Sequence, residues 1–222
     1  MINNVIALAK KTDELYEYLR QHNFQFNKHG FPVFTREMFL DEWPEMVITY
    51  EKRNDKLVHD PKKTLLCFYC PDKDLYPRLD KVLDEIDEYK RFMGSVFMDI
   101  TVTNDLPHDT QRLIMLANHL HGAVLAANGI KIVANLRTGD EESRKYLSGI
   151  PVNAMCSCGF LGCDVLKEEY DFSFLRKIMQ VLPRKLVIYG KEDPIATKQL
   201  HGNGINYRYY PDFHTYSKSL RD

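Results

Sequence analysis

The chain has 222 residues, of which 44% are hydrophobic and 27% are charged, and its net charge at pH 7 is -1. These values are ordinary for one soluble globular domain, and they give no overall basic character of the kind that binds nucleic acid or anionic membranes. There is no run of about 18 apolar residues and no signal-like apolar segment at the start, so we expect a cytoplasmic protein without a membrane partner.

The first sixty residues are expected to hold one helix and two short strands. Leu8, Thr12, Leu15 and Leu19 recur at helical spacing, which predicts a helix over 4–20 that Asn3 or Asn4 caps. The apolar stretches 31–34 and 46–50 are strand candidates.

From residue 64 strands and helices alternate. Short apolar runs predict strands at 64–69, 95–100, 130–135, 151–156, 185–190 and 205–210. Helical spacing between them predicts helices at 75–92, 109–128, 140–147, 172–182 and 194–201. Asn128-Gly129 is expected to end the longest of these helices.

This alternation predicts a single α/β domain over 1–222 whose units at 64–210 form a mainly parallel sheet, because helical crossovers join parallel strands. Six strands and the two early candidates are enough for an eight-stranded, TIM-barrel-like sheet. An open doubly wound sheet is the alternative. The short helices at 140–147 and 194–201 favour the barrel.

In both folds, ligands bind beyond the carboxyl ends of the strands. Asp99, Asp105 and Asp140 follow or end strands at this rim, and we expect them to act as metal-binding or general-base groups. Mg²⁺ is the cofactor that fits them, because it takes one or two carboxylates together with substrate phosphates. Capping of a helix by Asp140 is the simpler interpretation of that residue.

The same rim carries candidate ligand-binding residues. Asn135 ends a strand, and Arg137 has the guanidinium geometry that clamps a phosphate or carboxylate. Ser157, Gly159 and Gly162 belong to a small-residue loop, SCGFLG, whose backbone N–H groups suit an anion. A plain tight turn is the alternative interpretation of that loop.

Four of the five cysteines form the candidate metal set: Cys70, Cys156, Cys158 and Cys163. Zinc or an iron–sulfur cluster is the metal chemistry that such thiolates favour. Cys67 lies within a strand, so Cys67 and Cys70 should face opposite sides of the sheet. Buried, unreactive thiols are the simpler interpretation, and an odd number of cysteines is typical of a reducing compartment.

Several stretches together resemble an uncharacterised family of Gram-positive bacteria, their plasmids and phages. They are FMDITVTNDLP, NGIKIVANLRTGD, SGIPVNAM with the following GFLGC, and KLVIYG, within about residues 30 to 215. The family has P-D-F-S-like, G-I-x-V-I-P, G-I-P and G-C motifs. The resemblance implies a phage or mobile-element origin and no particular activity. The chain departs from the family pattern at Cys67, Cys70 and Met98.

These observations support three functional hypotheses. The first is a protein that binds a phosphate-bearing ligand, a nucleotide or nucleic acid, at the carboxyl rim, with Mg²⁺-dependent hydrolysis as its extended form. The second is a non-catalytic phage accessory protein that binds and inhibits a host protein through a surface such as the acidic segment 72–88. The third is a metal or redox sensor built on the cysteines. Whether the protein is an enzyme stays open at this stage.

Overall fold

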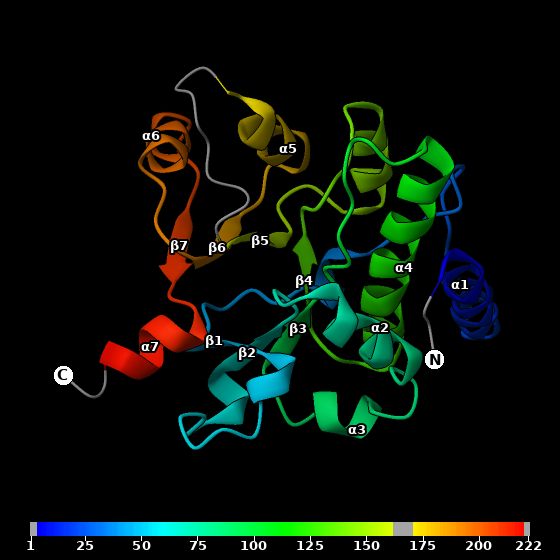
Figure 1. Ribbon diagram of the computed structural model, residues 1–222, viewed down its shortest axis with the longest axis horizontal. Helices are drawn as coiled ribbons and strands as arrows, with labels where there is room; N and C mark the ends of the chain where they lie inside the picture. The colour runs from blue at the N-terminus through cyan, green and yellow to red at the C-terminus, as the bar shows by residue number, and fades with distance from the viewer. Residues whose placement is uncertain (1–3, 162–170, 220–222) are drawn as a thin grey trace.

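Within the residues that the structure describes, 4–161 and 171–219, seven parallel strands form one sheet that curls almost into a closed barrel (Figure 1). The structure is a computed structural model. The strands are β1 (Met46–Thr49), β2 (Thr64–Cys67), β3 (Gly94–Val96), β4 (Ile132–Asn135), β5 (Met155–Phe160), β6 (Lys185–Gly190) and β7 (Tyr207–Tyr210). Each strand pairs with the next one in the chain, which confirms the TIM-barrel-like α/β fold. The doubly wound alternative is wrong, because the strand order never reverses.

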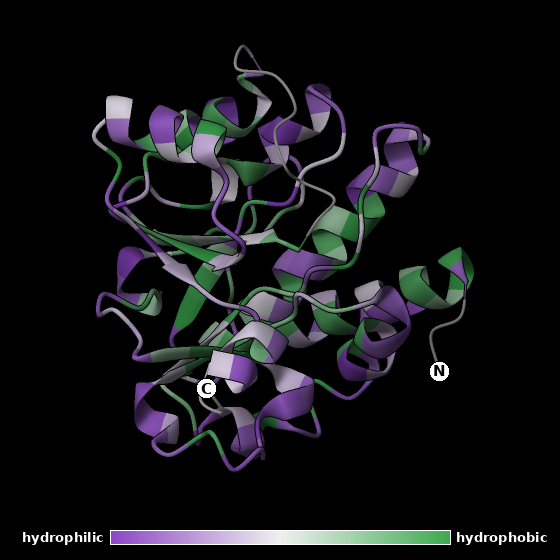
Figure 2. Ribbon diagram, turned by 60° about the vertical axis from the view of Figure 1, so that its left-hand side comes forward, coloured by the Kyte–Doolittle hydropathy of each residue, from purple (hydrophilic) through white to green (hydrophobic). Residues whose placement is uncertain are grey.

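Side chains from all of these strands fill the barrel interior. One buried apolar cluster takes a residue from every strand: Val47, Leu65, Val96, Val133, Met155, Val187 and Tyr210. The alternate residues of the strands face outward and join a larger cluster under the helices. Figure 2 shows the hydrophobic ribbon concentrated in the central strands. Burial on both faces explains why the strands read as continuous apolar runs.

The helices cover the outside of the barrel. They are α1 (Val5–Gln21), α2 (Asp72–Asp80), α3 (Ile86–Tyr89), α4 (His108–Ala127), α5 (Ser173–Val181), α6 (Pro194–Gly202) and α7 (Phe213–Ser219). The 3₁₀ turns are η1 (Arg36–Met38), η2 (Tyr50–Lys52), η3 (Pro61–Lys63) and η4 (Glu142–Gly149). Helix α1 lies alongside α4 (Figure 1). None of the helices described here is long and apolar enough to cross a membrane.

The predicted helix ends are confirmed at two places. The Asn4 side chain accepts a hydrogen bond of 2.9 Å from the Ala7 N–H and caps α1. Gly129 follows α4 with φ +77°, the left-handed conformation that a glycine adopts without strain. The helix predicted over 75–92 is instead divided into α2 and α3 by a turn, and α7 was not predicted.

The predicted strand at 31–34 is wrong, which leaves seven strands in place of eight. Pro32 makes an isolated antiparallel bridge with Phe26 and has no backbone N–H to extend a ladder. Phe31 and Phe34 are buried all the same, because their rings pack on aromatic side chains of α4 and the barrel wall. The apolar pattern therefore predicted the burial of this segment correctly, but its pairing as a strand incorrectly.

The predicted strand at 151–156 begins four residues late. Asn153 adopts φ +64° in a turn after Pro151, and β5 runs from Met155 to Phe160 between β4 and β6. The stretch from Ser157 to Phe160 is therefore the end of a paired strand and not a rim loop.

Side chains close the seam between the two edge strands. The Tyr210 hydroxyl of β7 donates a hydrogen bond of 2.8 Å to the carbonyl oxygen of Pro44, which precedes β1. The Arg208 guanidinium lies 4.7 Å from the centre of the Trp43 ring. These contacts link β7 to the segment that precedes β1, where no eighth strand is present among the described residues.

Candidate functional site

A pocket of about 270 Å³ opens at the carboxyl rim, beyond β4 and β5 and beside the first turn of α5. Its polar lining residues are Asp99, Asn135, Arg137, Thr138, Asp171, Ser173 and Lys177. Its other lining residues are Val102, Leu136, Cys158, Gly159, Phe160 and Phe174. The pocket lies where ligands bind in parallel α/β folds.

The pocket brings together five of the predicted residues: Asp99, Asn135, Arg137, Cys158 and Gly159. The first three of these are hydrogen-bonded to one another. Arg137 Nε donates to Asp99 Oδ1 at 2.7 Å, and Arg137 Nη2 donates to Asp99 Oδ2 at 2.8 Å. Asn135 Nδ2 donates to Asp99 Oδ1 at 2.6 Å. Neighbouring parallel strands end at the same rim, which is why residues 36 and 38 positions apart meet here.

Burial of the Asp99–Arg137 ion pair restricts the positions that its two side chains can adopt. The Asp99 side chain is only 5% exposed, whereas that of Arg137 is 25% exposed. A carboxylate of this burial needs its charge compensated, and a bidentate guanidinium with a further amide donor does so. Asp99 therefore fixes the guanidinium of Arg137 at the wall of the pocket.

Helix α5 supplies the second cation of the pocket. Lys177 and Ser173 lie one turn apart on α5, and both line the cavity. Asp171 accepts a hydrogen bond of 2.9 Å from the Ser173 N–H, and hydrogen bonds from Ser173 hold the pKa of Asp171 below its usual value. These three residues were not predicted, because a lysine on an amphipathic helix and a serine or aspartate near its start have no signal that separates them from ordinary solvated residues.

Asp105 and Asp140 do not line this pocket. Asp105 is exposed, and a hydrogen bond from the Thr103 hydroxyl lowers its pKa. Asp140 accepts the backbone N–H of Ser143 at 2.8 Å, which is the main cause of its lowered pKa. The carboxylate of Asp140 thus closes the turn that leads into η4.

Ser157 and Gly159 lie on the interior side of β5 beside Tyr69, and Gly159 also borders the pocket. Ser157 is fully buried, and its hydroxyl accepts a hydrogen bond of 2.7 Å from the buried Tyr69 hydroxyl. A Cβ on Gly159 would lie 2.5 Å from the Tyr69 ring, so the absence of a side chain makes room for that ring. Gly162 lies outside the described residues.

Replacing Gly159 with alanine is expected to lower the free energy of unfolding by about 1–3 kcal/mol, the usual range for overpacking a buried site. The added methyl group forces the Tyr69 ring away and strains its bond to Ser157. Chemical denaturation measures the change. The control is Gly202→Ala in α6, where a Cβ meets nothing within 4 Å. Equal stability of the two variants would contradict the packing described here.

The cysteines are divided between the two faces of the sheet. Cys67 lies in the interior cluster, while Cys70, Cys156 and Cys158 pack with the outer cluster, as predicted for Cys67 and Cys70. Burial raises the pKa of Cys156, and it raises that of Cys70 to about 12, so both are thiols at neutral pH. In the part of the chain described, no three His, Cys, Asp or Glu side chains are grouped to hold a metal ion. Cys163 lies outside the described residues.

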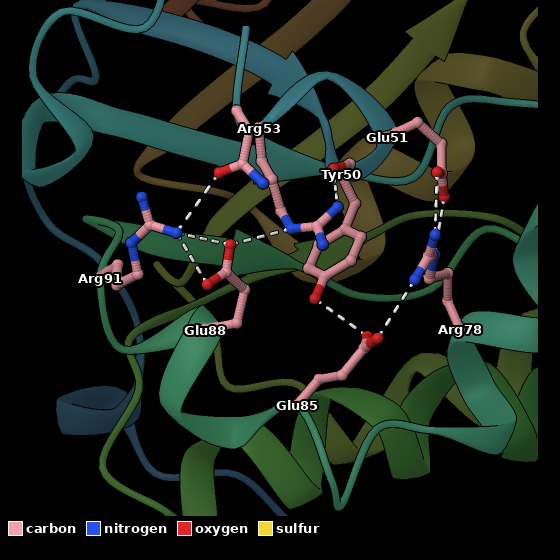
Figure 3. Close-up of polar contacts among 8 residues, drawn as sticks. Tyr50, Glu51, Arg53, Arg78, Glu85, Glu88 and Arg91 are labelled. Atoms are coloured by element: carbon pink, nitrogen blue, oxygen red, sulfur yellow. Dashed lines mark hydrogen bonds and ion pairs between the residues drawn. The ribbon is translucent and has the colours of Figure 1, made fainter.

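Some carboxylates of the acidic segment 72–88 form ion pairs and hydrogen bonds within the protein (Figure 3). Glu85 accepts hydrogen bonds from the buried Tyr50 hydroxyl at 2.9 Å and from Arg78 at 3.1 Å. Glu88 pairs with Arg53 at 3.0 Å and with Arg91 at 2.7 Å. These two carboxylates tie α3 and its flanks to η2, so they contribute little to an acidic docking face.

One family model matches the chain. It is that of DUF4417, a domain of unknown function, and it covers residues 27–210. No curated protein and no solved structure matches the chain. The match covers most of the barrel and all of its strands, and it agrees with the resemblance to an uncharacterised family. The chain belongs to the DUF4417 family.

Proposed function

We propose that the protein binds a phosphate-bearing ligand, a nucleotide or a nucleic-acid end, in the rim pocket defined above. The observation that carries this proposal is the buried Asp99–Arg137 pair, because it holds a guanidinium at the wall of a polar cavity. Arginine suits phosphate because its planar guanidinium carries five N–H donors, and the bonds to Asp99 use two of them.

The rest of the lining supports the same ligand. Lys177 adds a positive charge from α5, and Thr138 and Ser173 add hydroxyl groups. The first turn of α5 also borders the pocket, and the backbone N–H groups of a first helical turn have no partner within the helix. A volume of about 270 Å³ is small for a whole nucleotide, so the phosphate is the part that enters.

The extended form of the proposal is Mg²⁺-dependent hydrolysis. Both oxygens of Asp99 already accept hydrogen bonds from Arg137 and Asn135, so the carboxylate proposed for the metal is that of Asp171, which lines the pocket among the described residues. Asp105 and Asp140 do not line the pocket. One or two carboxylates with substrate phosphate oxygens are a usual environment for Mg²⁺. A phage or mobile-element origin, which the resemblance implies, stays part of this hypothesis.

Lys177→Ala is expected to weaken the binding of inorganic phosphate about tenfold, since a charge-assisted hydrogen bond contributes about 1.5–3 kcal/mol. Isothermal titration calorimetry with inorganic phosphate, a nucleoside 5′-monophosphate and a 5′-phosphorylated oligonucleotide measures this change. Lys10→Ala on α1 removes the same charge from an exposed position outside the pocket and serves as the control. If none of the three probes binds the wild-type protein, with or without Mg²⁺, the proposed function is wrong.

A further inference from the structure

One buried glutamine joins the two rim loops that border the pocket. Gln111 lies in the first turn of α4 and is 1% exposed. Its Nε2 donates to the Leu106 carbonyl oxygen at 2.8 Å and to Asp140 Oδ2 at 3.2 Å. Its Oε1 accepts the Asp140 backbone N–H at 2.9 Å. A single amide thus bonds the loop 101–107 after β3 to the loop 136–141 after β4.

Gly139 is required for this close approach. A Cβ built on Gly139 would lie 2.0 Å from Gln111 Oε1 and 2.8 Å from Val102 Cγ1. Atoms cannot approach so closely, so a side chain at this position must either displace the hydrogen-bonded Gln111 amide and the Val102 methyl group or push the loop 136–141 away from α4. The contact sets how far Gly139 and its neighbour Thr138 lie from the other rim loop.

The loop 136–141 is also rigid on its far side. The Gly139 N–H donates to Ser143 Oγ at 2.9 Å, and that hydroxyl donates to the Asp140 carbonyl oxygen at 2.7 Å. Ser143 is fully buried, and its backbone N–H donates to Asp140 Oδ1. A displacement at Gln111 is therefore transmitted along the loop and is not absorbed by a flexible turn.

Both loops joined by Gln111 contribute pocket residues. Val102 comes from the first loop, and Arg137 and Thr138 come from the second. We propose that Gln111 is a positioning residue of the rim pocket, which sets the location of Arg137 and Thr138 through Gly139 and Asp140. This inference rests on the proposed function for the identity of the ligand, but the positioning itself concerns the unliganded protein.

The first test therefore uses no ligand. The Arg137 Nε–H is hydrogen-bonded to Asp99 and is observable as a side-chain resonance by ¹⁵N NMR. Gln111→Glu keeps the size of the side chain but loses the amide donor and places a second carboxylate beside Asp140. We expect this variant to shift the Arg137 Nε–H resonance and to speed its exchange with water. Thr12→Val on α1, which removes another buried hydrogen bond outside the pocket, is the control and should leave the resonance unchanged.

The second test measures inorganic phosphate binding and includes a rescue. We expect Gly139→Ala to weaken binding about tenfold, the effect of losing about 1.4 kcal/mol. In a Gln111→Ala background the clash of the new methyl group with the Gln111 amide is gone and only the contact with Val102 Cγ1 remains. There Gly139→Ala should change the Kd by less than about threefold. A general loss of stability would not produce this dependence on the background.

The outcomes separate the two proposals. An Arg137 resonance and a phosphate Kd that stay at their wild-type values in Gln111→Glu and Gly139→Ala overturn the positioning role. A shifted resonance in a protein that binds no phosphate supports the positioning role and rejects the proposed function. An equal effect of Gly139→Ala in both backgrounds also overturns the inference, because it excludes action through Gln111.

Discussion

Arg137→Ala is expected to lower the free energy of unfolding by about 2–3 kcal/mol and to abolish phosphate binding. The substitution removes two hydrogen bonds from a carboxylate that is 5% exposed and leaves Asn135 as its remaining donor among those described above. The expected loss lies below the upper range for buried ion pairs because Arg137 itself is a quarter exposed, so that water reaches the site. Urea denaturation and phosphate titration measure the two effects.

The double variant Asp99→Asn, Arg137→Ala separates stability from binding. It removes the stranded charge as well as the guanidinium, so we expect it to recover at least half of the lost stability while phosphate binding stays absent. Unchanged binding of every nucleotide and nucleic-acid probe by the double variant would lead us to reject the rim pocket as the ligand site. A single variant as stable as the wild type would show that the ion pair is not desolvated as described.

Acidification from pH 7 to pH 5 is expected to cost about 4 kcal/mol of stability through His119 and His121 of α4, at about 1.4 kcal/mol per pH unit for each histidine. Burial lowers their pKa values to about 4 for His119 and about 3 for His121. Each ring packs edge-on against phenylalanine, and neither Nδ1 atom has a hydrogen-bond partner. Protonation of either imidazole would therefore leave a buried Nδ1–H without an acceptor.

The sign follows from proton linkage. The unfolded chain takes up a proton on each histidine near pH 6.5, whereas the folded protein does so only near pH 4 and pH 3. The contribution of the two neutral histidines to the free energy of unfolding is therefore fully present above pH 6.5 and is lost as the pH falls. The slope of that free energy against pH approaches the value for an uptake of two protons on unfolding. Exposed carboxylates titrate near pH 4 in the unfolded chain, so the interval from pH 6.5 to pH 5 reports mainly on these histidines.

The free energy of unfolding, measured by denaturation at several pH values, gives this slope. His121→Gln should halve the slope between pH 6.5 and pH 5, whatever its effect on absolute stability. His201→Gln, at an exposed position of α6, should leave the slope unchanged. A wild-type slope below half a proton would contradict the neutral burial of both rings.

Much of the fold could be predicted because its pattern is local. Each strand of a barrel covered by helices is buried on both faces, so β2, β4 and β6 appear in the sequence as short apolar runs between turn residues. The same reasoning grouped Asp99, Asn135 and Arg137, because parallel strands deliver the residues at their carboxyl ends to one rim. The prediction of a strand at 31–34 was wrong because buried aromatic residues occur both in strands and in irregular segments that pack into the core.

The sequence by itself determined the α/β class, the parallel order implied by helical crossovers and the rim on which a site should form, because these depend on periodicity and on short-range turn signals. Only the tertiary structure decided that the sheet is a singly wound barrel. The tertiary structure also decided the register of β5, which makes Ser157 and Gly159 part of the barrel wall. It also decided that Lys177 and Asp171 line the pocket and that Gln111 joins its loops. These features depend on contacts between residues distant in the chain. Local sequence patterns do not identify the partners in such contacts, which are set by packing and hydrogen bonding in the folded protein.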